Sequence, residues 1–272
     1  MGRTRKNKNG GTPKETLKQA AVRRTIEGAG ALVAAVYRGT REPERAGYVG
    51  AATVNVVSSA LGAEKIRKAS KTVLMPLLAA SVIRRRHETK PAVTTGLLVG
   101  LTAGWIGDLV LMPRNNDLNK GAAAFAVNQV AYIKMLHDAG ARPNRFRALT
   151  RYPLWAASVA GAAFTRPDLL PAAAGYGLLL TGTSMLGDDS TLVDGLTSPA
   201  DLAPGADLAA VDPRFGIGHG GNLFLISDAL LMLRALVGED TIVGKLLDAG
   251  VMDTYTAAQL LLVDGILELG RK

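Results

Sequence analysis

Two aspartates lie inside long apolar stretches of the chain, where burying a carboxylate is energetically unfavourable. Asp108 is the only charged residue in residues 92–113, and Asp228 is the only formally charged residue in residues 217–233, with histidine counted as neutral. An ionisable group at such depth is costly and is by default a functional-site hypothesis. Two neighbouring buried carboxyl groups can share one proton, so that one serves as an acid and the other as a base.

Other polar side chains at similar apolar depth are candidates to line one pocket with the two aspartates. Gln129 and Tyr132 are three residues apart, and Tyr255 and Gln259 are four apart, so each pair shares one face of a helix. The remaining candidates are Lys71, Asn222 and Ser227. Each alone is explained by a helix–helix hydrogen bond or a snorkelling side chain. Taken together they fit an acid/base enzyme and a proton-coupled transporter equally well.

Several motifs that usually carry cofactors or metals are unconvincing in this chain. Residues 216–221 satisfy G-x-G-x-x-G, but a Pro/Asp-rich loop precedes them instead of the strand that a dinucleotide site requires. There is no cysteine, and the three histidines form no H-x-x-x-H pair, which argues against a zinc site. Asp188, Asp189 and Asp194 lack the glycine and terminal glutamate of a calcium-binding EF-hand loop. We expect no metal and no organic cofactor.

The elements that must position the candidate residues are a series of uncharged or nearly uncharged blocks. They cover residues 47–63, 72–83, 92–113, 121–136, 152–165, 169–187, 217–233 and 251–267. With their flanks, these blocks approach the ~20 residues that a membrane span needs. A soluble helical bundle would need polar stripes at helical period, which most of the blocks lack. We therefore predict an all-α, polytopic integral membrane bundle of about eight transmembrane helices.

The net charge of +9 comes mostly from one end of the chain, which argues against a nucleic-acid-binding protein. Residues 1–24 contain eight lysines and arginines and a single glutamate, whereas the rest of the chain is nearly balanced. We expect residues 1–46 to be a basic, largely disordered or peripheral cytoplasmic segment. Residues 47–272 would form the transmembrane domain, with a polar loop at about 188–216.

Basic loops predict the orientation of the spans. Residues 84–87, residues 142–151 and the C-terminal Arg271-Lys272 fall on the same side as the basic N-terminus if about eight spans alternate. Positively charged loops favour the cytoplasmic side of a membrane. One loop conflicts, because residues 64–71 carry four basic residues on the opposite side. We expect both termini to be cytoplasmic and the protein to reside in the cell membrane.

The candidate residues, in this order, resemble the YhhN family of lysoplasmalogenase-like membrane proteins. Residues 71–78 (KTVLMPLL) are similar to the Lys-Pro-containing start of a family span, and residues 107–111 (GDLVL) to the Gly-Asp-x-x-Leu signature. Residues 220–228 (GGNLFLISD) resemble the segment that ends in Ser-Asp. Gly121, Phe125, Tyr132, Tyr255 and Gln259 complete the pattern at family-like spacing. The resemblance runs from about residue 47 to the end of the chain.

The resemblance implies hydrolysis of the vinyl-ether bond of a lysoplasmalogen in the lipid bilayer. The products would be a fatty aldehyde and glycerophosphoethanolamine or glycerophosphocholine. One of Asp108 and Asp228 would be the acid, and the other would position water. The substrate-orienting residues would be Gln129, Tyr132, Asn222, Ser227, Tyr255 and Gln259, and Lys71 would bind the phosphate or tune an aspartate. The alternatives are a proton-coupled transporter of small solutes or lipids that uses the same aspartates, and a membrane scaffold whose basic tail recruits an acidic partner.

Overall fold

The computed structural model describes residues 16–113, 117–203, 206–207, 210–238 and 241–272. Within these residues the chain forms nine α-helices and no β-strand, which confirms the predicted all-α class. The helices are α1 (Leu17–Arg38), α2 (Pro43–Leu61), α3 (Glu64–Arg84), α4 (Pro91–Val110), α5 (Leu118–Asp138), α6 (Arg145–Thr165), α7 (Gly177–Gly187), α8 (Gly216–Val237) and α9 (Ile242–Leu269). A π-helical segment, η2 (Ala172–Tyr176), leads directly into α7.

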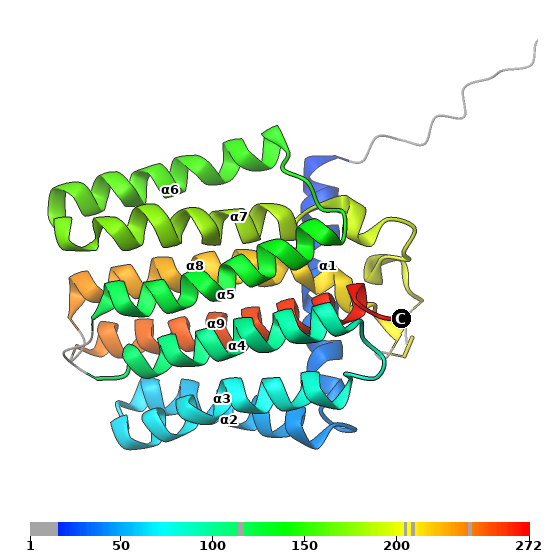
Figure 1. The fold of residues 1–272 in the computed structure, drawn as a ribbon, viewed down its shortest axis with the longest axis horizontal. Coiled ribbons are helices and arrows are strands. Elements are labelled where there is room, and N and C mark those ends of the chain that lie inside the picture. The colour runs from blue at the N-terminus through cyan, green and yellow to red at the C-terminus, as the bar shows by residue number, and fades with distance from the viewer. Residues whose placement is uncertain (1–15, 114–116, 204–205, 208–209, 239–240) are drawn as a thin grey trace, which may run out of the picture.

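Helices α2 to α9 lie side by side and alternate in direction, whereas α1 runs across them near the end that carries the C-terminus (Figure 1). Helix α6 lies at one edge of the bundle beside α7, and α2 and α3 form the other edge. Helix α9 is central, because it packs against α8, α2, α3, α4 and α1. Between Tyr255 and Leu267 nearly every side chain of α9 is buried.

Local sequence explains where the helices begin and end. Pro43 and Pro91 occupy the first turns of α2 and α4, where the missing backbone N–H costs no hydrogen bond. Gly62 ends α2 in the left-handed conformation with φ of 69°, which glycine adopts without strain. The Asn144 and Thr241 side chains accept backbone hydrogen bonds at the starts of α6 and α9.

The helices overlap the predicted apolar blocks, and the chain between α7 and α8 covers the residues of the predicted polar loop. Its described residues contain only short 3-10 helices: η3 (Ser190–Val193), η4 (Pro199–Asp201) and η6 (Pro213–Phe215). In the N-terminal segment, residues 17–38 form α1, a helix of six turns packed on the bundle. Residues 1–15 of the predicted basic segment lie outside the described residues.

Two stretches among the described residues are long and apolar enough to cross a membrane by themselves. They are Pro91–Val110, which contains Asp108, and Pro213–Arg234, which contains Asp228. The two aspartates thus lie on the two most membrane-like helices, and a bundle of about eight spans stays a prediction.

Candidate active site

The Asp108 carboxyl group is the centre of the candidate site. It lies near the C-terminal end of α4 and is only 1% exposed. The Tyr255 hydroxyl of α9 donates a hydrogen bond of 2.8 Å to Oδ2, and the Lys71 ammonium of α3 lies 3.2 Å from Oδ1. Each carboxylate oxygen therefore has one partner, and the two partners come from different helices.

A chain of hydrogen bonds extends this centre to α5. The Tyr132 hydroxyl donates to Oε1 of Gln259 at 2.5 Å, and the Gln259 amide donates to the Tyr255 hydroxyl at 3.5 Å. Tyr132 and Gln259 are fully buried. The helical spacing predicted that Tyr255 and Gln259 share a face, and the chain Tyr132–Gln259–Tyr255–Asp108 connects α5, α9 and α4 through that face.

Asp228 of α8 lies at the other side of a cluster of aromatic rings. Tyr255 makes edge-to-face contacts with Phe224 at 5.5 Å and with Phe125 at 6.0 Å between ring centres, and Phe125 also contacts Tyr176 at 6.3 Å. The Tyr176 hydroxyl is a hydrogen-bond partner of the Asp228 carboxyl and lies within electrostatic range of Asp108. The aromatic cluster therefore joins the surroundings of the two aspartates.

Glycines let these helices approach one another closely. A Cβ atom at Gly107 would lie 2.7 Å from the Phe125 ring, so the glycine before Asp108 makes room for the aromatic cluster. On α8, a Cβ at Gly220 would lie 2.9 Å from Leu262 of α9, and one at Gly221 would lie 2.8 Å from the Ser184 backbone of α7. Gly221, the last glycine of the apparent G-x-G-x-x-G motif, thus serves helix packing.

Three of the predicted substrate-orienting residues lie outside the hydrogen-bonded chain at Asp108. The Asn222 side chain accepts hydrogen bonds from Ser184 at 2.7 Å and from Arg151 at 3.1 Å, nearer the N-terminal end of α8. Ser227 donates to the Val251 backbone carbonyl at 3.0 Å, which joins α8 to α9. The Gln129 amide donates to Asn128 at 3.4 Å, and its buried oxygen has no hydrogen-bond partner among the residues that the structure describes.

Sequence reasoning missed Tyr176, whose hydroxyl lies close enough to both Asp108 and Asp228 to interact with their carboxyl groups. It is the one tyrosine in the uncharged block 169–187, and that isolation was the available signal. The chain reaches its position through η2, whose wider turns alter the direction of the side chains that follow. Such π-helical turns occur frequently at functional sites.

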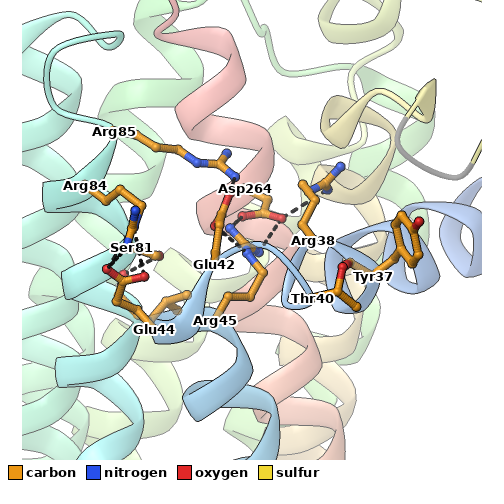
Figure 2. A network of polar contacts seen from close by, with 11 residues as sticks. Tyr37, Arg38, Thr40, Glu42, Glu44, Arg45, Ser81, Arg84, Arg85 and Asp264 are labelled. Atoms are coloured by element: carbon orange, nitrogen blue, oxygen red, sulfur yellow. Dashed lines mark hydrogen bonds and ion pairs between the residues drawn. The ribbon is translucent and has the colours of Figure 1, made fainter.

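A further buried aspartate, Asp264, was also missed, and Figure 2 shows its surroundings. Arg45 donates to both carboxylate oxygens at 2.5 and 2.7 Å, and Arg38 donates to Oδ2 at 3.1 Å. Arg45 also contacts Glu42 at 3.0 Å, and Glu42 pairs with Arg85. The signal was a charged residue inside the block 251–267, together with two arginines near the start of α2.

Among the described residues, no group of three or more histidine, cysteine or acidic side chains is arranged to hold a metal ion. Asp188 and Asp189, considered above as possible ligands, instead pair with arginines. Arg151 lies 3.0 Å from Asp188, and Arg147 lies 3.2 Å from Asp189.

Comparison with known proteins identifies the family of the chain. No curated protein and no solved structure is detectably similar to it. The family model described as the YhhN family matches residues 66–266, which is well over half of the chain and includes Lys71, Asp108, Asp228 and Tyr255. The chain therefore belongs to the YhhN family.

Proposed function

We propose that the protein is an integral membrane hydrolase that cleaves the vinyl-ether bond of lysoplasmalogens to a fatty aldehyde and a glycerophospho head group. The YhhN family includes lysoplasmalogenases. The observation that carries the proposal is Asp108, a buried carboxylate held, within the described part of the chain, by one lysine and one tyrosine. Aromatic rings connect it to a second acid, Asp228.

Membrane insertion is supported by the outer surface of the bundle. Large apolar side chains are exposed on nearly every long helix, as a surface that faces lipid requires. They include Val54, Val57, Ile66, Val73, Val99, Ile106, Val127, Val130, Leu154, Phe164, Ile226 and Leu246. The alternating helices place residues 84–87, residues 142–151 and the C-terminus at one end of the bundle, so that the positive loops and both termini would be cytoplasmic.

The chemistry needs an acid, an activated water and negative charge near a cation. Proton transfer to the β-carbon of the vinyl ether gives an oxocarbenium ion, and water then attacks the carbon attached to oxygen. The resulting hemiacetal collapses to the aldehyde and releases the glycerol hydroxyl. Negative charge beside the oxocarbenium ion stabilises the transition state that leads to it.

The charges around the two aspartates suggest how these roles are divided. Lys71 supplies a positive charge to Asp108, whereas no ion pair among the described residues reaches Asp228. We assign the proton-donating role to Asp228, with Tyr176 orienting its carboxyl group. Asp108 would then stabilise the oxocarbenium ion and position water, held in place by Tyr255. Lys71, in this account, tunes Asp108 instead of binding the lipid phosphate.

The proposal is tested by incubating detergent-purified protein with lysoplasmenylethanolamine or lysoplasmenylcholine and measuring released fatty aldehyde. The control substrate is the saturated alkyl-ether analogue, which lacks the double bond that accepts the proton. The matched control for Asp108→Asn is Asp253→Asn, because Asp253 is an exposed aspartate on α9. Aldehyde from the wild type and from Asp253→Asn, but not from Asp108→Asn, supports the proposal. Absence of aldehyde from folded wild type with both head groups contradicts it and favours proton-coupled transport.

A further inference from the structure

Helix α1 has one face against the bundle and an opposite face that is also largely apolar. On the inner face Ala31, Ala34 and Ala35 are buried, and Glu27 accepts a hydrogen bond of 2.7 Å from Ser198. This face packs against α9, α8, η4 and η6. The small alanines permit close contact, which fixes the position of α1 relative to the bundle.

The outer face of α1 carries a row of exposed large side chains. It consists of Val22, Ile26, Val33, Val36 and Tyr37, which are between 37% and 52% exposed. The intervals of four, seven and three to four residues place them along one side of a helix. In water this row would leave substantial apolar surface uncovered, which a soluble surface helix normally avoids.

The direction of α1 indicates what covers this row. Because α1 runs across α2 to α9 near one end of the bundle, it lies parallel to a membrane that those helices span, at the depth of their ends (Figure 1). That depth is the boundary between head groups and acyl chains. An amphipathic helix in this orientation binds the boundary through its apolar side, and its basic residues attract anionic head groups.

The positive charge at this end of the bundle also fits binding to a membrane surface with anionic head groups. Lys18 lies in the first turn of α1, and Arg23 and Arg24 follow it, where they pair with Asp201 and Asp188. Residues 1–14 contribute five more basic residues and no acidic one. Basic residues close to an anionic leaflet are attracted to its surface. The family match begins only at residue 66, so α1 and its basic extension precede the matched domain.

We infer that α1 is an interfacial membrane helix, whose face from Val22 to Tyr37 lies in the head-group and acyl-chain boundary of a leaflet containing anionic lipids. The inference depends on the membrane insertion in the proposed function but not on the reaction. It assigns the N-terminal extension the role of binding the lipid surface beside the bundle.

The absence of cysteine makes a direct depth measurement practical. Single variants Ile26→Cys and Val33→Cys are labelled with a polarity-sensitive fluorophore, and the full chain is placed in vesicles of phosphatidylcholine and phosphatidylglycerol in equal parts. Quenching is compared between lipids spin-labelled near the head group and lipids labelled deep in the acyl chain. Thr197→Cys in the exposed loop is the aqueous control, and Val99→Cys on the outer face of α4 is the deep control.

We expect labels at positions 26 and 33 to be quenched about threefold more by shallow than by deep spin labels. Quenching no greater than at position 197 would overturn the inference, and so would a deep pattern like that at position 99. If position 99 itself shows no quenching by lipid, then membrane insertion fails. Lipid quenching at position 99 without aldehyde release would instead contradict only the proposed reaction.

Discussion

Asp108 and Asp264 are both about 1% exposed, yet their hydrogen-bond partners differ. The difference distinguishes a carboxylate that could react from one that stabilises the fold. Asp264 receives three hydrogen bonds from Arg38 and Arg45, so both oxygens are held by guanidinium groups (Figure 2). Asp108 has one lysine and one tyrosine. Burial of a carboxylate therefore does not identify a reactive group. The number and rigidity of its partners distinguish the two cases.

The two carboxylates also connect different parts of the chain. The partners of Asp264 come from α1 and the start of α2, which precede the region matched by the family model. Lys71, Asp108 and Tyr255 all lie inside that region. We interpret the Asp264 cluster as a clamp that holds the N-terminal helices on α9, and the Asp108 site as the part that carries the reaction.

The largest expected effect sharpens this contrast at Asp108. Asp108→Asn preserves the shape of the side chain and removes its charge, so we expect turnover to fall by at least ~10³-fold. The unfolding midpoint should remain near that of the wild type, as shown by thermal unfolding in detergent. Full turnover by this variant would exclude Asp108 from the reaction.

The opposite result is expected at Asp264. Asp264→Asn leaves the fully buried Arg45 without its main counter-charge, and breaking such a pair costs about 3 kcal/mol or more in the free energy of unfolding. Protein that remains folded should retain its turnover per molecule. The measurement is denaturant unfolding beside Asp253→Asn. A stable but inactive Asp264→Asn variant would break the distinction between the two aspartates.

A smaller effect is expected at Tyr176. Tyr176→Phe keeps the ring that contacts Phe125 and removes the hydroxyl that orients Asp228. Loss of one such hydrogen bond should lower turnover about tenfold. The pH profile of turnover should also shift, which a purely structural change would not produce. Tyr152→Phe is the control, since Tyr152 lies on the outer helix α6, and an equal loss in both variants would contradict the assignment.

The smallest effect concerns pH and the clamp. Burial raises the pKa of Glu42, but hydrogen bonds from Arg85 and Arg45 and their positive charges outweigh it and hold this pKa below its usual value. The ionised Glu42 carboxylate therefore stabilises the folded state fully above its unfolded pKa of about 4.3, and this stabilisation is lost as pH falls below that value. The stability advantage of the wild type over Glu42→Gln should shrink on acidification below that pH. An advantage that does not change with pH would contradict this account.

The sequence predicted the helical class because apolar blocks are a local pattern, and it singled out Lys71 and Tyr255 as polar residues in or beside such blocks. Apolar blocks predicted the positions of the helices, and the i, i+4 spacing placed Tyr255 and Gln259 on one face. Hydropathy, however, does not say which neighbour a polar group meets. Asn222 and Ser227 belong to the same apolar stretch as Asp228, yet Asn222 bonds to Arg151 and Ser184, and Ser227 bonds to a backbone carbonyl. Asp264 and Tyr176 were missed because their partners are distant in sequence.

The most direct test of the central claim is to run the reaction in D₂O and analyse the released aldehyde by mass spectrometry. If the site protonates the β-carbon of the vinyl ether, the wild-type protein should release aldehyde with one deuterium at carbon 2, and Asp108→Asn should release none. Wild-type aldehyde without deuterium at carbon 2, or equal labelled product from Asp108→Asn, would contradict the account.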